Sequence, residues 1–334
     1  MIEPQVCFRS KARPVKISSG GNFTLLLLED GSLYMAGKLP LVVDSESVAL
    51  DPVNQFWIQV PGQFTDVACG WAHVAAITQS GVVVTGGIGE KGELGQSQTK
   101  CSTELRPIRV LENRQGAQVF ACFYNTYVLD NDVLYGCGSN NKSQLKDPKS
   151  RVIETLERVS DDPVTRVCAG KNFVCYEDAC SRLHARGPMV QYESQLQEHA
   201  DQNSSFELKA MWTSVTSFSG QMFHFYAPAN QKQDAIVNYR FPKPVTAWNT
   251  GSEHGIACVD GKMVFCWGWG EHGNCGRIAT SRVANGVNDM SNINSDVNLA
   301  YDASSRPNAT VYACFGGCAT SWVCIAHKDF QEDV

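Results

Sequence analysis

Two stretches of this chain have the spacing of a nucleotide site, since 87–92 and 268–273 both fit the glycine fingerprint G-x-G-x-x-G. A dinucleotide site needs a helix directly after the last glycine, so that the amino end of the helix meets the pyrophosphate. No amphipathic helical pattern follows either stretch, and both occupy the same place in a longer repeat. We therefore interpret these glycines as turn residues that need positive φ or a close backbone approach.

Metal-binding and catalytic patterns are also weak. Glutamate precedes histidine at Glu253-His254 and at Glu271-His272, but adjacent residues on a strand point to opposite faces and do not form a chelating pair. The sequence contains neither the zinc motif H-E-x-x-H nor the nucleophile motif G-x-S-x-G. We expect no cofactor, no metal and no enzymatic activity.

The fourteen cysteines admit two explanations, one as disulfides or metal ligands and the other as small buried hydrophobes. No pair has the spacing C-x-x-C, and many of the cysteines lie inside apolar stretches. The first residues lack the basic end and apolar stretch of a secretion signal. We therefore expect fourteen reduced thiols in a protein of the cytoplasm, or of the cytoplasm and the nucleus.

Composition limits the class of protein further. The 334 residues carry a formal charge of −6, and 43% of them are apolar while 19% are charged. This charged share is below the roughly 25% of average soluble proteins, so the chain can bury a large core. The acidic balance argues against direct nucleic-acid binding. No apolar run reaches the length of about 18 residues that predicts a membrane-spanning helix.

A repeat of about fifty residues organises the chain. Its anchors, mostly glycines, recur at positions 20, 70, 122, 170, 211, 251 and 317. Two apolar runs follow an anchor, as at 74–78 and 82–85, and an Asp-Gly or Ser-Gly turn separates them. This pattern predicts antiparallel strands joined by a tight turn. Seven such units favour a ring of blades over a solenoid of strands, which would have a shorter period.

Two polar segments exceed what one repeat requires. Residues 188–206 form a polar connection that contains the one plausible short helix, at 192–200. Residues 277–308 are rich in Asn, Ser and Asp, which predicts a long loop. No linker divides the chain. We therefore expect a single domain over 1–334, an all-β propeller of seven blades with polar insertions at about 188–206 and 277–308.

Tryptophans gather in the last three repeats. Trp267 alternates with Phe265 along an expected strand, which predicts a place in the core. Trp269 follows that strand in a glycine-rich loop beside charged residues, where tryptophan is a common binding hot spot. For Trp269 we keep two hypotheses open, one as a surface anchor and one as packing within its own blade.

The repeat resembles that of the regulator of chromosome condensation family, whose members form seven-bladed β-propellers. The resemblance rests on the pattern apolar-x-x-Gly-x-x-His and on tails such as Gly92-Glu93-Leu94-Gly95, and it covers nearly the whole chain. It is tightest at 135–151, 211–214, 251–276 and 315–322. In these stretches the chain resembles the alpha-tubulin-suppressor, or killer-toxin-insensitivity, group of yeast propellers.

This resemblance implies a non-catalytic propeller that forms a heterodimer with the CSL-type zinc-finger protein of diphthamide synthesis. The heterodimer would support diphthamide formation on elongation factor two and Elongator-dependent modification of wobble uridines in transfer RNA. Elongator and the diphthamide-synthesis enzymes would then be indirect partners. The alternative is a guanine-nucleotide exchange factor for a small GTPase, as in the founding member of the family. The acidic balance and the absence of a basic tail count against it.

The candidate contact residues come from the stretches of tightest resemblance, and some of them are residues that the repeat itself does not require. They are Trp212, Glu253, His254, Trp269, Glu271, His272, Asn274 and Trp322.

One departure from the family pattern concerns the amino terminus, where residues 5–10 lead straight to Val15 without the usual strand and glycine tail. Because that strand normally completes the last blade, we expect the closing strand to be short.

Overall fold

The computed structural model describes residues 4–39, 41, 52–113, 115–202, 205–226, 238–277 and 297–327. Residues 6–201 form one compact unit, and residues 202–334 with the first five residues form a second. We call these two compact units the N-terminal unit and the C-terminal unit. Among the described residues, no helix is long and apolar enough to cross a membrane.

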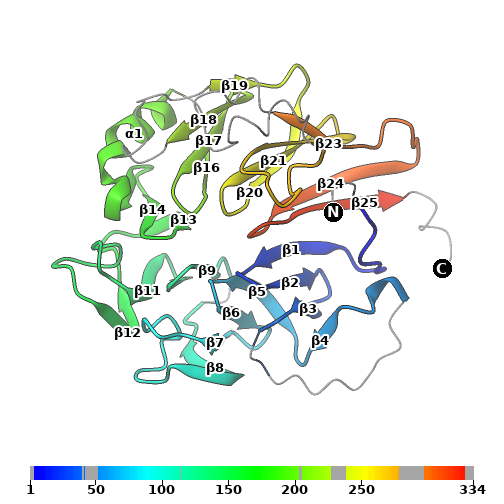
Figure 1. Cartoon of the computed structure of the whole chain (residues 1–334). Coiled ribbons are helices and arrows are strands. Elements are labelled where there is room, and N and C mark those ends of the chain that lie inside the picture. Colours follow the sequence, from blue (N-terminus) through cyan, green and yellow to red (C-terminus); the bar gives the residue numbers. More distant parts are fainter. Residues whose placement is uncertain are drawn as a thin grey trace. The chain divides into compact units, whose positions relative to one another are not determined.

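The N-terminal unit contains four antiparallel sheets whose strands follow one another in chain order (Figure 1). The first sheet is β1 (Pro14–Ser19), β2 (Phe23–Leu28), β3 (Leu33–Gly37) and β4 (Ile58–Val60), and the second is β5 (Phe64–Cys69), β6 (His73–Thr78), β7 (Val82–Ile88) and β8 (Cys101–Val110). The third is β9 (Gln118–Cys122), β10 (Asn125–Asp130), β11 (Val133–Ser139) and β12 (Val152–Arg158), and the fourth is β13 (Val164–Gly170), β14 (Phe173–Asp178) and β15 (Leu183–Arg186).

The C-terminal unit contains the remaining described sheets. The fifth is β16 (Glu207–Ala210), β17 (Val215–Ser219), β18 (Met222–Tyr226) and β19 (Asn238–Arg240), and the sixth is β20 (Val245–Thr250), β21 (His254–Val259), β22 (Met263–Gly268) and β23 (Asn298–Asp302). The seventh is the hairpin of β24 (Ala309–Gly316) and β25 (Ser321–His327). Each anchor that the sequence predicts lies at the end of the first strand of one sheet or in the turn directly after it, so the repeat is confirmed.

The expected number of blades is corrected from seven to six, because the seventh described sheet has only two strands. The amino-terminal segment explains the difference, since residues 4–13 form no strand. That segment packs within the N-terminal unit instead. The Phe8 ring lies 5.1 Å from the Tyr34 ring and 5.5 Å from the Trp57 ring, and the Trp57 indole donates to the Cys7 carbonyl at 2.9 Å.

Among the described residues, three short helices interrupt the sheets at two places. They are η1 (Pro52–Asn54), η2 (Gly187–Tyr192) and α1 (Glu193–Asp201), and α1 confirms the short helix expected at 192–200. The prediction of a long loop at 277–308 is wrong at its carboxyl end, because residues 298–302 form β23 and pair with β22. Residues 278–296, the middle of that expected loop, lie outside the described residues.

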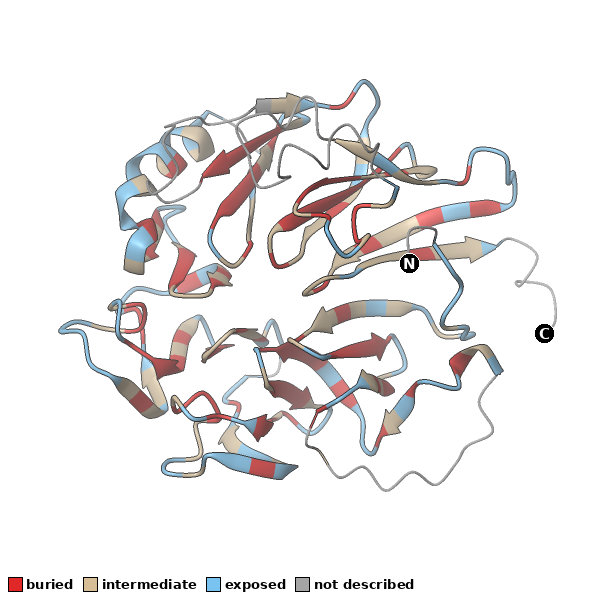
Figure 2. Ribbon diagram, viewed as in Figure 1, coloured by how far each residue is buried: buried red, intermediate tan, exposed pale blue. Residues whose placement is uncertain are grey.

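The core of each unit lies between successive sheets. It is built by side chains that point alternately to the two faces of each strand. In the second sheet, Val67 and Val74 pack toward the first sheet, while Ala68 and Ala75 pack toward the third. Side chains two residues apart share a face of a strand, so an inner strand covered on both faces becomes apolar throughout. The buried run Phe23–Leu28 of β2 is an example, and Figure 2 shows the inner strands largely buried.

The burial of the cysteines yields a prediction about their reactivity. The structure leaves all fourteen thiols free, with Cys7, Cys101 and Cys180 exposed and ten others buried. Burial raises the pKa of the Cys69 thiol to about 12, which suppresses the reactive thiolate. In the native protein, Ellman's reagent should therefore react rapidly with three thiols.

Denaturant without reductant should then reveal fourteen thiols. The variant Cys180→Ser serves as the control and should lower the rapid count to two without changing the slow phase. A total below about twelve thiols in fresh denatured protein would reveal disulfides and contradict the reducing environment that we expect.

Candidate partner-binding surface

A four-residue turn joins the first and second strands of the sheets, and its geometry recurs. The amide of the first residue donates to the carbonyl of the fourth in Gly70–His73 at 2.9 Å and in Gly251–His254 at 2.7 Å. Glycine at the first position has a steric reason. A Cβ on Gly251 would lie 2.2 Å from the Cε1 of His254 and 2.5 Å from the Gly317 carbonyl oxygen.

The histidine that ends this turn reaches the next sheet. The Nε2 of His73 lies 2.9 Å from the hydroxyl of Thr126 at the start of β10, and the Nε2 of His254 lies 3.0 Å from the hydroxyl of Ser321 at the start of β25. The Thr126 hydroxyl donates its one hydrogen to the Glu93 carbonyl at 2.7 Å. The Nε2–H of His73 must therefore be the donor to Thr126, which leaves Nδ1 unprotonated.

These two histidines are neutral groups of the core. Both side chains are fully buried. Burial lowers the pKa of His73 to about 3 and that of His254 to about 4, because the charged imidazolium loses its hydration. His254 was a candidate contact residue, and its burial assigns it instead to the junction between β21 and β25.

The loop after β22 carries the candidate residues Trp269, Glu271, His272 and Asn274. Gly268 has a φ of 87°, which agrees with the role of a turn residue that we expected. Trp269 is half-buried and its ring meets the His272 ring edge-on at 4.8 Å and 84°, whereas Glu271 and His272 are exposed. Trp267, as predicted, is a buried core residue at 1% exposure.

Hydrogen bonds fix the backbone of this loop. The Trp269 amide donates to the Glu253 carbonyl at 2.8 Å, and the Trp269 carbonyl accepts from the Asn274 side-chain amide at 2.7 Å. Asn274 is buried, so this candidate holds the loop and does not face a partner. The indole of Trp269 therefore projects from a backbone that is anchored at both its N–H and its C=O.

Neighbouring turns of the same unit bring further candidates to this loop. Glu253 is half-buried and accepts from the Thr213 hydroxyl at 3.0 Å. The Trp212 amide donates to the Ser252 carbonyl at 2.7 Å, and the Ser252 amide donates to the Gly317 carbonyl at 3.0 Å. The turns before β17, β21 and β25 thus form one hydrogen-bonded row along one end of the C-terminal unit.

Trp322 lies at the end of this row, half-buried on β25 directly after Ser321, and its indole N–H donates to the Thr320 hydroxyl at 3.0 Å. Six of the eight candidates therefore lie on these linked loops with accessible side chains. We define the Trp269 surface as Trp212, Glu253, Trp269, Glu271, His272 and Trp322. An aromatic anchor flanked by two carboxylates suits recognition of a protein partner, whereas the loop offers no set of convergent nucleophiles.

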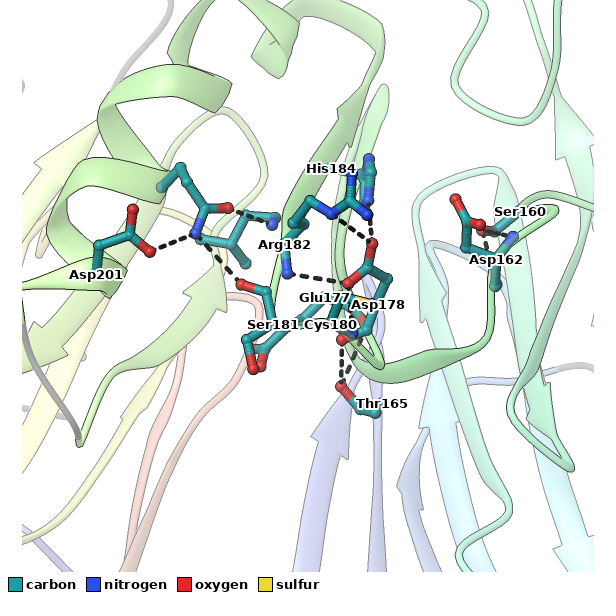
Figure 3. A network of polar contacts seen from close by, with 12 residues as sticks. Ser160, Asp162, Thr165, Glu177, Asp178, Cys180, Ser181, Arg182, His184 and Asp201 are labelled. Atoms are coloured by element: carbon teal, nitrogen blue, oxygen red, sulfur yellow. Dashed lines mark hydrogen bonds and ion pairs between the residues drawn. The ribbon is translucent and has the colours of Figure 1, made fainter.

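A polar cluster in the N-terminal unit was not found from the sequence. Ligand atoms of Asp162, Asp178 and His184 lie within 4.8 Å of one another. Figure 3 draws the three residues with their neighbours. Asp178 Oδ1 accepts from the amides of Cys180 at 2.8 Å and Arg182 at 3.0 Å, and Oδ2 lies 3.0 Å from the His184 Nε2. The His184 contact and these amides lower the pKa of Asp178.

Both oxygens of Asp178 are therefore engaged, and the guanidinium of Arg182 lies 3.8 Å from Oδ2. A nearby cation disfavours a metal ion, so the cluster is best explained as an anchor for the turn between β14 and β15. No spacing signal could have revealed it, because Asp162 comes from the loop before β13 and meets the other two only in the folded unit.

Comparisons with known proteins agree on the type of fold. The RCC1 repeat-containing protein C10F6.04 of Schizosaccharomyces pombe is 25% identical over 345 residues, covering 93% of this chain and 89% of that protein. The human regulator of chromosome condensation is 24% identical over 186 residues, covering 53% of this chain and 42% of that protein. No family model matches the chain.

A solved structure supports the same fold. The crystal structure of human WBSCR16 covers 96% of this chain and 88% of its own, with a TM-score of 0.68 and 14% sequence identity. At this identity the likeness concerns the fold alone. The repeat relatives and this structure together support an all-β propeller of RCC1 type.

The two buried histidines predict how stability depends on pH. Their pKa values in the folded protein, about 3 and about 4, lie below the unfolded value of about 6.5. The unfolded chain therefore binds more protons, and stability that is complete above pH 6.5 falls as the pH drops toward 4. Between pH 7 and pH 5, each histidine should lower the free energy of unfolding by roughly 2 kcal/mol.

Urea unfolding at both pH values measures this loss. The variant His254→Gln, which keeps a side-chain donor, should lose less stability between pH 7 and pH 5 than the natural protein, by roughly the share of one histidine. An identical loss in the two proteins would mean that His254 does not stay neutral in the fold.

Proposed function

We propose that this chain, an RCC1-type propeller, is a non-catalytic binding protein that forms a heterodimer with a CSL-type zinc-finger protein. Through that heterodimer it would support diphthamide synthesis on elongation factor two and Elongator-dependent modification of wobble uridines. The sequence resemblance at 211–214, 251–276 and 315–322 supports this proposal, because these stretches supply the Trp269 surface. The protein would act in the cytoplasm, or in both the cytoplasm and the nucleus.

The observation that carries the proposal is the anchored, half-buried indole of Trp269. Its repeat counterpart in the second sheet is Ile88, so the fold itself does not require tryptophan at this position. The backbone of Trp269 is fixed through Glu253 and Asn274, which reduces the conformational entropy lost when a partner binds. A fixed aromatic side chain of this kind typically dominates the affinity of an interface.

The charges of the surface suggest what the partner presents. Glu253 is half-buried and Glu271 is exposed, so a complementary partner would place basic or hydrogen-bond-donating groups around an apolar pocket for the indole. Charges at the rim of an interface act mainly on the association rate and its salt dependence. The glutamates would therefore steer the encounter, and the indole would slow dissociation.

Titration calorimetry with the purified CSL-type zinc-finger protein tests this assignment. Trp269→Ala should weaken binding at least tenfold, since burial of an aromatic anchor contributes about 2 kcal/mol or more. Glu271→Ala should change mainly the association rate and its dependence on salt. The control is Phe56→Ala, which removes an equally apolar ring of 74% exposure from the N-terminal unit and should leave the affinity unchanged.

An unchanged affinity of a folded Trp269→Ala protein would place the interface elsewhere. The alternative function has its own readout, because an exchange factor would accelerate release of labelled guanine nucleotide from a small GTPase. Acceleration of that release, with no binding of the zinc-finger protein, would replace the proposed function.

A further inference from the structure

A second row of side chains lies in the N-terminal unit, at the second position of the turn between the first two strands of each sheet. This position holds Gly21, Trp71, Phe123 and Lys171 in four successive sheets, and we call these residues the Trp71 row. Backbone bonds place the first three side by side. The Gly21 amide donates to the Trp71 carbonyl at 2.8 Å, and the Trp71 amide donates to the Phe123 carbonyl at 2.9 Å.

The side chains of the row form a continuous stack. The rings of Trp71 and Phe123 are stacked with centroids 5.1 Å apart at 23°, and the Lys171 ammonium lies 4.3 Å from the centre of the Phe123 ring. Gly21 covers Trp71 so closely that a Cβ on this glycine would lie 3.1 Å from the indole. Stacked aromatic rings and a cation over a ring face are both favourable contacts.

The backbone of Phe123 is strained, which argues that its ring is held in place for a purpose. Its φ is 52°, in the left-handed region that a bulky residue seldom adopts. Such a conformation is energetically costly, and residues that adopt it cluster at functional sites. The fold does not demand a ring here, because the same position carries glycine or lysine in the first and fourth sheets.

The surroundings of the row are apolar and basic. Trp71 and Ile88 are each 39% exposed, and the Ile88 amide donates to the carbonyl of Ala72 beside Trp71. The loops after β3 and β11, at the same end of their sheets, add the exposed residues Lys38 and Lys142. Neither these two lysines nor Lys171 forms an ion pair with any residue that the structure describes. This end of an acidic protein therefore presents positive charge. Glu90 is an opposing group on the loop after β7, and Asp147 and Glu193 line the same pocket as Lys142.

The stacking geometry distinguishes between two classes of ligand. A nucleic-acid base needs a free ring face on which to stack. Here Gly21 and Phe123 flank Trp71, and Trp71 and Lys171 flank Phe123, so the row offers ring edges to solvent rather than faces. Ring edges and Ile88 suit aliphatic or aromatic side chains, while the lysines suit carboxylates. We propose that the Trp71 row docks an acidic peptide segment of a partner protein, one that alternates carboxylates with apolar side chains.

This inference concerns a different unit from the Trp269 surface, and it is tested with the full chain and a defined probe. The probe is the fluorescein-labelled peptide Asp-Glu-Phe-Asp-Glu-Leu-Asp-Glu, and fluorescence anisotropy measures its binding. The acidic peptide should bind, and its affinity should fall as salt is raised. A peptide with lysine at every acidic position should not bind, and one with serine in place of Phe and Leu should bind at least tenfold more weakly.

Variants assign the binding to the row. Trp71→Ala should weaken binding of the acidic peptide at least tenfold, and Lys171→Glu should weaken it and reduce its salt dependence. Phe123→Gly should also weaken binding, while its urea midpoint stays unchanged or rises because glycine removes the backbone strain. The matched control Trp269→Ala should bind the peptide like the natural chain, whatever its effect on the zinc-finger protein.

Three outcomes would overturn the proposal. The first is equal peptide affinity of Trp71→Ala and the natural chain, or no binding of the acidic peptide at all. The second is tighter binding of a 20-nucleotide oligothymidine than of the peptide, abolished by Trp71→Ala. The third is that light scattering shows a dimer of the natural chain but a monomer of Trp71→Ala. The occupant of the row would then be a second copy of this chain.

Discussion

A buried imidazole that hydrogen-bonds across two sheets is the constraint on which much of this structure depends. His73 joins the second sheet to Thr126 of the third, and His254 joins the sixth sheet to Ser321 of the seventh. Each imidazole sits against the glycine that opens its own turn, so Gly70 and Gly251 cannot carry a side chain there. The Gly-x-x-His pattern is therefore the sequence signature of a junction between sheets and not of a catalytic site.

This junction leaves the residue after the glycine free to vary. The first and fourth positions of the turn are fixed by packing, but the second varies in residue type and links neighbouring turns through its backbone amide. In the N-terminal unit this position carries Trp71, Phe123 and Lys171, and in the C-terminal unit it carries Trp212 and Ser252. A rigid turn with one variable side chain per sheet can present different chemistry on the same scaffold, which is typical of binding proteins.

The sequence predicts the sheets well because the turn and both inner strands are local features. Glycine spacing and apolar runs identified every sheet, and the alternation of Phe265 with Trp267 placed Trp267 correctly in the core. The errors concern long-range packing. Phe8 turns toward Tyr34 and Trp57, so the amino-terminal strand is not formed among the described residues. The short strand β23 was missed because it follows a long stretch rich in Asn, Ser and Asp.

The candidate surface could be predicted only in part, because its local features show in the sequence and its long-range contacts do not. Trp269, Glu271 and His272 exceed what the repeat needs, and a comparison of repeats reveals such additions. His254 and Asn274 were misjudged because polarity suggests exposure, whereas both are buried and each makes one specific hydrogen bond through a side-chain nitrogen. The Trp71 row was missed because the stacking of Trp71, Phe123 and Lys171 joins residues about fifty positions apart, and only the folded sheets bring them together.

We propose that the Trp269 surface recognises a zinc-finger partner through loops whose backbone is already fixed. Amide hydrogen exchange, measured on the chain alone and in complex with the CSL-type protein, tests this claim most directly. We expect slower exchange for residues 268–277 and 211–214 in the complex, and little change in the Gly70–His73 turn. Slower exchange confined to residues 70–73 and 122–125, with none at 268–277, would contradict it.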